Sequence, residues 1–118
     1  MPFDSLEWVN LADTLAANGD EASFRAAIGR YYYAVFVKSR DTLSANGLLT
    51  VSHGDGDHRA VVEALNNNKR GAAGQALNSL RRGRNTADYD TTLPVSGSDV
   101  SRAKHQAAEV QRICKDDW

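Results

Sequence analysis

The chain has 118 residues, which is enough to bury one hydrophobic core, so we expect a single domain over residues 1–118. Its net charge of −1 excludes a protein that coats nucleic acid through overall charge. The single cysteine, Cys114, excludes an internal disulfide and a cysteine-based zinc site. No apolar run reaches the roughly 18 residues of a membrane span, and no basic residue precedes Arg25. We therefore expect a cytoplasmic protein with neither a membrane helix nor a secretory signal.

The segment PFDSLEW predicts the start of a first helix. Asp4 is a suitable N-cap, Glu7 follows at the capping-box spacing, and Phe3 can pack on Trp8 as a hydrophobic staple. Apolar residues then recur at helical spacing, and the Asn-Gly pair at 18–19 predicts a left-handed end to this helix.

A second, much longer helix is predicted over 20–46, because this segment has no proline and ends on another Asn-Gly pair. Its apolar residues cover two adjacent faces, which is typical of a helix packed by several neighbours. Arg30 lies among these residues, where a guanidinium needs an acid, a carbonyl or a ligand. Two alternatives remain open for Arg30: an ion pair with Asp88 and the binding of a ligand.

Three more helices follow. After a glycine-rich loop, helical spacing predicts two shorter helices separated near Gly71, then a loop with proline and glycine, and a last helix from about Ser98. No segment has the sustained alternation of a strand. The predicted fold is all-α, an up-down helical bundle of four main helices plus one shorter helix.

Charge is distributed unevenly along the chain. Residues 1–23 carry five acids and no Lys or Arg, whereas residues 59–84 carry six basic residues and one acid. A basic segment on a nearly neutral protein predicts a local anion-binding face, with a solvated helix face as the alternative.

The sequence HGDGDH at 53–58 places two histidines and two aspartates close together, and such a set can hold a divalent ion. Two glycines leave the segment without a fixed geometry, and no further ligand is fixed nearby. We therefore favour a polar loop in which His58 begins the next helix, and we predict no metal and no cofactor.

The densest group of reactive side chains is RRGRNTADYD at 81–90. The planar fork of arginine matches phosphate oxygens and stays charged, so the segment is suited to bind a phosphate. Metal-free RNA cleavage also needs a base, a role for which Asp88 among arginines is poorly suited. The structural alternative is an ordinary ion pair between Arg84 and Asp88, four residues apart, with Tyr89 packed on the long helix.

Three segments occur in a particular order and spacing: RYYYAVF at 30–36, SHGDGDHRAVVEAL at 52–65 and LNSLRRGRNTADYD at 77–90. Together they resemble the higher eukaryote and prokaryote nucleotide-binding (HEPN) domain family. In the small stand-alone prokaryotic branch of that family a histidine leads into a helix, as His58 does here. The resemblance covers most of the chain, and the last helix is compatible with it.

The resemblance implies a helical bundle that dimerises and places polar motifs of two subunits around one cleft. Many family members are metal-independent ribonucleases, and many act as toxins beside a nucleotidyltransferase-like antitoxin. The active members carry an arginine that is followed, after four to six residues, by a histidine. In this chain the arginines of the motif are followed by Asp88, and none of the three histidines falls in that window.

We therefore favour a HEPN-like protein that binds RNA or a nucleotide, with weak or no RNA cleavage. It would act as a homodimer and as the partner subunit of a nucleotidyltransferase in a toxin-antitoxin or defence-type system. One alternative is a metal-independent endoribonuclease toxin that uses Arg84, Asp88 and Tyr89, and the other is a structural dimerisation module.

The same side chains carry the first two interpretations. We hypothesise that Arg84 faces the cleft, that Asp88 orients Arg30 or Arg84, and that the Tyr89 hydroxyl is open to modification by the partner. The further ligand-binding candidates are Arg30, Tyr33, Arg81 and Arg82.

Overall fold

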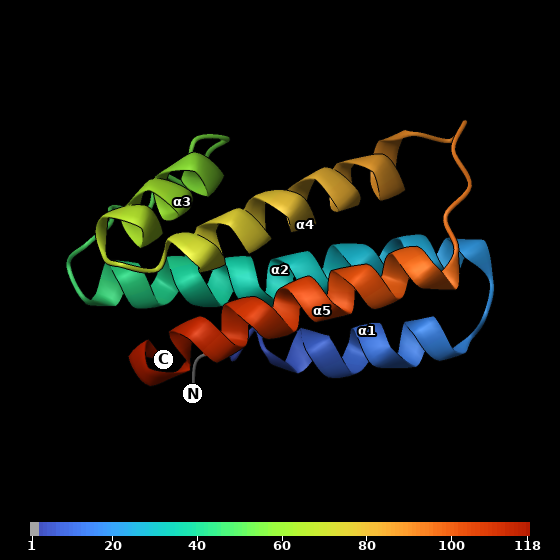
Figure 1. The fold of residues 1–118 in the computed structure, drawn as a ribbon, viewed down its shortest axis with the longest axis horizontal. Helices are drawn as coiled ribbons and strands as arrows, with labels where there is room; N and C mark the ends of the chain where they lie inside the picture. Colours follow the sequence, from blue (N-terminus) through green and yellow to red (C-terminus); the bar gives the residue numbers. More distant parts are fainter. Residues whose placement is uncertain (1–2) are drawn as a thin grey trace.

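The computed structural model describes residues 3–118, and this part of the chain contains five α-helices and no strand. The helices are α1 (Glu7–Ala17), α2 (Glu21–Ala45), α3 (Asp57–Asn67), α4 (Gly71–Tyr89) and α5 (Gly97–Cys114), followed by a short 3-10 turn (Lys115–Asp117). Figure 1 shows α2 along the middle of the bundle, with α1, α4 and α5 packed against it and α3 beside the start of α4. The predicted all-α helical bundle is confirmed.

Both Asn-Gly pairs end helices as predicted. Gly19 and Gly47 have φ angles of 78° and 74°, in the left-handed region that glycine adopts without strain. Asp20 caps the start of α2, since its side chain accepts a hydrogen bond of 3.0 Å from the backbone N–H of Ser23. These local signals set the length of the central helix.

The start of α1 differs in one respect from the prediction. The staple is present, with the rings of Phe3 and Trp8 5.2 Å apart, and Asp4 Oδ1 accepts a bond of 3.0 Å from the Leu6 N–H. The predicted capping box is wrong, because no hydrogen bond joins the Glu7 side chain to the Asp4 backbone within residues 3–118. The regular helix begins only at Glu7, so this residue does not occupy the third helical position.

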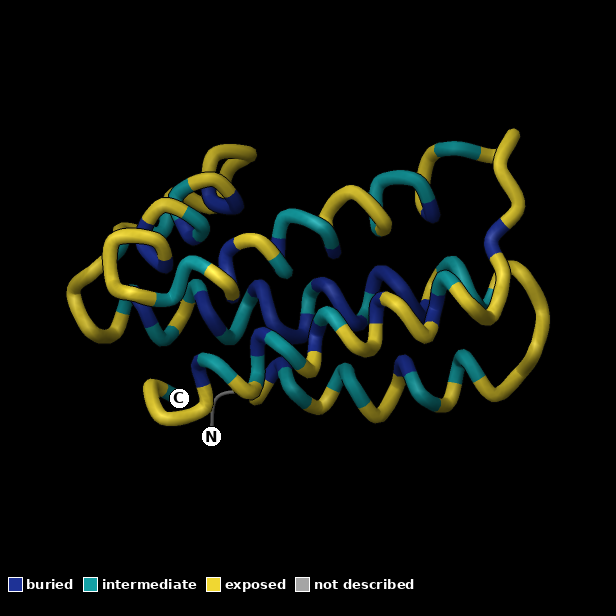
Figure 2. Tube along the Cα trace, in the orientation of Figure 1, coloured by how far each residue is buried: buried dark blue, intermediate teal, exposed yellow. Residues whose placement is uncertain are grey.

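A capping box does occur at α5, where Ser96 and Asp99 bond to each other's backbone N–H groups. The buried side of this helix is the predicted one: Val100, Ala103, Ala107, Val110 and Cys114. Figure 2 shows that buried positions of α2 and α5 face the interior of the bundle. Burial raises the pKa of the Cys114 thiol to about 11, so this cysteine stays protonated at neutral pH and packs as an apolar side chain.

None of the helices within residues 3–118 combines the length and the apolar character that a membrane span requires.

Candidate functional site

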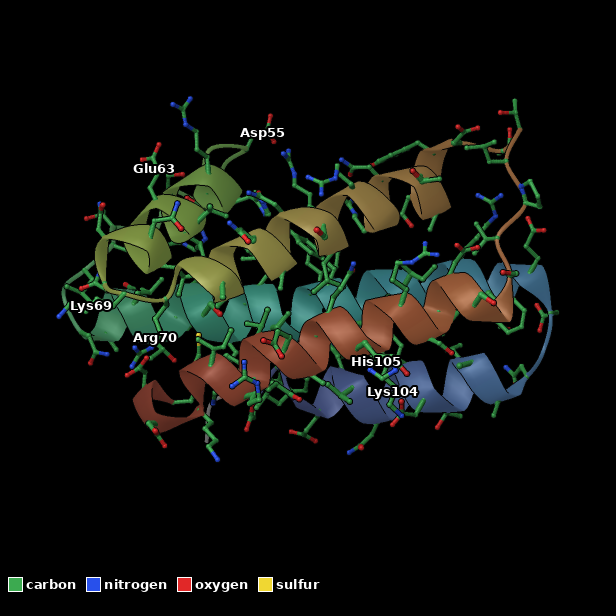
Figure 3. All side chains as sticks on the ribbon, in the orientation of Figure 1. Asp55, Glu63, Lys69, Arg70, Lys104 and His105 are labelled. Carbon is green, nitrogen blue, oxygen red and sulfur yellow. The ribbon has the colours of Figure 1, made fainter. Side chains whose placement is uncertain are left out.

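The carboxylate of Asp57 is hydrogen-bonded to the loop that precedes α3. The carboxylate of Asp57 accepts bonds from the Ser52 N–H (3.0 Å), the Ser52 hydroxyl (2.6 Å) and the His53 N–H (2.9 Å). These bonds, the Ser52 hydroxyl first, lower the pKa of Asp57. Asp55 points away from the bundle (Figure 3). The segment before α3 is therefore a polar loop, as we favoured, and the carboxylate of Asp57 in the first turn of α3 closes it.

His58, in the first turn of α3, is a buried residue that links three helices. Its Nδ1 lies 2.7 Å from the Tyr32 hydroxyl of α2, and its Nε2 lies 2.9 Å from Asn78 Oδ1 of α4. The amide oxygen can only accept, so Nε2 carries the proton and Nδ1 accepts from Tyr32. Burial is the main cause that lowers the pKa of His58, and the charge of Arg81 lowers it further. His58 is thus a neutral cross-link between α2, α3 and α4.

We expect this cross-link to make stability depend on pH. The pKa of folded His58 is below its ordinary value of 6.5, so the unfolded chain takes up a proton first as the pH falls. The free energy of unfolding should be highest above pH 6.5 and should fall below it, by up to about 1.4 kcal/mol per pH unit. Urea unfolding at a series of pH values measures this slope. The His58→Gln variant should lose it, and an equal slope in both proteins would refute the assignment.

Arginines and aromatic rings alternate across α1, α2 and α4. Arg84 of α4 lies over the Tyr33 ring at 5.1 Å and over the Tyr89 ring at 5.6 Å. Arg30 of α2 lies over the same Tyr33 ring at 5.3 Å and over the Trp8 ring at 5.1 Å. We call these five residues the arginine–aromatic cluster. Each contact is within the range of a cation–π interaction.

Asp88 is placed beside Arg84. Its Oδ2 lies 2.9 Å from Arg84 Nε, which gives the predicted ion pair. Arg84 Nε is buried, and Arg84 Nη1 donates a hydrogen bond of 3.1 Å to Asn85 Oδ1. The other carboxylate oxygen faces Gly29, where an added Cβ would lie 3.9 Å from it. No ion pair joins Asp88 to Arg30 in the described chain, so of the two arginines considered, Asp88 contacts Arg84.

Exposure differs sharply within the cluster. The Arg84 side chain is 18% exposed, whereas Tyr89 is 72% exposed. Arg84 is therefore held between two rings beside Asp88, while the Tyr89 ring is open to solvent. An anion that reaches Arg84 would lie beside an exposed aromatic surface.

The other two arginines of the motif are placed differently. Arg82 is on the α5 side of α4, where it donates a bond of 3.0 Å to the Ser79 hydroxyl. Arg81 is exposed. Burial raises the pKa of Tyr32 and the charge of Arg81 opposes this shift, whereas burial lowers the pKa of His58 and the charge of Arg81 adds to it. The structure thus brings Arg84 together with Arg30 and Tyr33 and separates Arg82 from them.

Arg25 fixes the end of α4, a role that no local pattern in the sequence indicates. Its Nη1 donates to the carbonyls of Ala87 (2.9 Å) and Asp90 (3.0 Å), and its Nη2 donates to the carbonyl of Leu93 (2.6 Å). The carbonyls at a helix C-terminus lack intrahelical partners and carry partial negative charge, so a guanidinium stabilises them. Arg25 therefore positions the helix end that carries Asp88 and Tyr89.

No family model and no solved structure matches the chain. An uncharacterized protein of Methanocaldococcus jannaschii is 30% identical to it over 103 residues, which cover 72% of this chain and 58% of that protein. The chain thus spans less than two thirds of the length of this curated relative. The name of the relative states no function.

The site supplies donors but no available base. Both ring nitrogens of His58 are engaged in hydrogen bonds, and Asp88 is paired with Arg84. Among residues 3–118 no group of three or more His, Cys, Asp or Glu side chains is arranged to hold a metal ion. The chemistry that the cluster offers is the binding of phosphate by guanidinium and the stacking of a planar group on Tyr89.

Proposed function

We propose that the protein binds single-stranded RNA or a nucleotide through the arginine–aromatic cluster, as a HEPN-like subunit. The observation that supports this proposal is the position of Arg84, whose guanidinium lies over two aromatic rings, one of which is open to solvent. Proteins recognise single-stranded RNA with such combinations, because arginine binds the phosphate and the base stacks on an aromatic ring.

Binding without cleavage is the form of this activity that the residues support. Cleavage would need a base at the 2′-hydroxyl, and the candidates are Asp88, beside Arg84, and His58, bonded to Tyr32. His58 is buried and bonded at both nitrogens, and Asp88 faces Arg84. The alternative, a ribonuclease that uses Arg84, Asp88 and Tyr89, would have to free Asp88 from this pair.

Incubation of the purified protein with labelled single-stranded RNA in the presence of a chelator separates the two activities. We expect a complex on a native gel and intact RNA on a denaturing gel. Efficient cutting that is lost in both Arg84→Ala and Asp88→Ala would establish the ribonuclease instead. A contaminating nuclease would cut equally in all three preparations.

We also propose that the protein is a homodimer and that it works beside a nucleotidyltransferase. One side of α2, which carries Arg30, Tyr33 and Val37, is only half-buried in the single chain. Three further apolar side chains are exposed: Phe3 before α1, Leu11 on α1 and Tyr89 at the end of α4. Apolar surface of this kind favours a partner, and a two-fold axis is the commonest arrangement.

Light scattering coupled to gel filtration tests the dimer. We expect a mass of two chains that falls toward one chain on dilution. A mass of one chain at every concentration would contradict this part of the proposal and would leave RNA binding by the cluster to be judged on its own measurement.

A further inference from the structure

A second site candidate lies on the other side of α4 from Tyr33. A cavity of about 480 Å³ opens between the second half of α4, the loop that follows it and the first half of α5. Its volume is within the range of about 300–1,000 Å³ that is usual for small-molecule sites. The loop and the facing ends of α4 and α5 are at the right of the view in Figure 1. The arginine–aromatic cluster contributes none of its lining residues.

The floor and one wall of this cavity are apolar. Ile28, Leu80, Val95 and Ala103 line it and are buried in the core. Leu93 also lines it, yet this side chain is 52% exposed. An exposed leucine beside a concave apolar surface leaves room for an apolar group of a ligand.

Two arginines at the rim carry one uncompensated positive charge. Arg102 is paired with Asp99, with Nη1 3.3 Å from Oδ1. Arg82 donates to the neutral Ser79 hydroxyl at 3.0 Å and forms no ion pair with an acid in the described chain. A guanidinium in this position suits one carboxylate, sulfonate or phosphate group, which it can bind with two parallel hydrogen bonds.

Gly83 favours the binding of a ligand in this cavity. It lies inside α4, where glycine costs about 1 kcal/mol relative to alanine. Apart from its two neighbours and the backbone of its own helix, an added Cβ at this position would meet no atom of the described chain within 4 Å. Close packing within the molecule therefore does not require this glycine, and its missing side chain widens the cavity that it lines.

We propose that this cavity binds a small organic monoanion with an apolar body. Arg82 binds the anionic group of this ligand, and the apolar floor of the cavity contacts its apolar body. The inference is independent of the RNA-binding proposal, because it uses the opposite side of α4. A matched pair of probes tests it: 8-anilinonaphthalene-1-sulfonate, which carries one negative charge, and the neutral N-phenyl-1-naphthylamine, whose fluorescence also rises in an apolar site.

We expect the folded protein to bind the sulfonate with a saturable rise in fluorescence, and to bind the neutral probe about tenfold more weakly. Arg82→Gln should weaken sulfonate binding about tenfold and leave the neutral probe unchanged. Gly83→Leu should fill the cavity and weaken the binding of both probes. The matched control is Arg59→Gln, which removes an exposed positive charge on α3 and should change neither affinity.

Both substituted positions are exposed, so the variants should fold, and an unchanged circular dichroism spectrum and unfolding midpoint verify this. Absence of saturable sulfonate binding by the native protein would overturn the proposal. It would also be overturned if folded Arg82→Gln or folded Gly83→Leu bound the sulfonate as tightly as Arg59→Gln does.

Discussion

Replacement of Arg25 by alanine is expected to lower the free energy of unfolding by about 3 kcal/mol. The guanidinium donates to the carbonyls of Ala87, Asp90 and Leu93, and the variant would leave these groups, at the end of α4 and in the loop after it, without their charged partner. Hydrogen bonds to a charged group contribute about 1.5–3 kcal/mol each, and water would replace part of this loss. Urea unfolding followed by circular dichroism measures the difference.

Glu21→Gln is the matched control for this prediction. It removes the ion pair between Glu21 and Arg25, in which Arg25 Nε lies 3.0 Å from the carboxylate, and leaves the bonds to α4 intact. The Glu21 side chain is half exposed, so its loss should cost no more than about 0.5 kcal/mol. If Arg25→Ala costs no more than Glu21→Gln, the anchoring role of Arg25 is wrong.

The second large effect concerns RNA binding. We expect Arg84→Gln and Tyr89→Ala each to weaken binding of single-stranded RNA by about tenfold to a hundredfold, since a charge-assisted hydrogen bond and a stacked base each contribute about 1–3 kcal/mol. Arg84 supplies the charged guanidinium and Tyr89 supplies the exposed ring. Fluorescence anisotropy with a labelled oligonucleotide measures the dissociation constants.

Tyr89→Phe separates stacking from the chemistry of the hydroxyl. The phenylalanine ring keeps the stacking surface, so RNA binding should remain close to that of the native protein. Equal losses in Tyr89→Phe and Tyr89→Ala would show that the hydroxyl, not the ring, makes the contact. If Tyr89→Ala binds RNA as tightly as the native protein, Tyr89 is not part of the binding site.

The helix ends could be predicted because their signals are local. The Asn-Gly pairs that close α1 and α2 act through the backbone of Gly19 and Gly47, and the cap of α2 joins Asp20 to Ser23, three residues away. The buried stripe of α5 follows in the same way from helical spacing. For such features the neighbouring residues hold all the information that is needed.

The candidate site could be predicted only in part, because its contacts join distant segments. The pair of Arg84 with Asp88 follows from their spacing along one helix. The contact of Arg30 with Trp8 and the bonds of Arg25 to the end of α4 depend on how the helices pack. The separation of Arg82 from Arg84 could have been found from the sequence, since two residues along a helix turn the side chain by about 200°.

The central claim, that Arg84 binds a phosphate of RNA, is tested most directly by the salt dependence of binding. Anisotropy titrations of native protein and of Arg84→Gln over a range of salt concentrations give the slope of log Kd against log salt. We predict that the variant has a higher Kd and a slope smaller by about 1, because one phosphate contact and its released counterion are lost. The same Kd and the same slope in both proteins would contradict the claim.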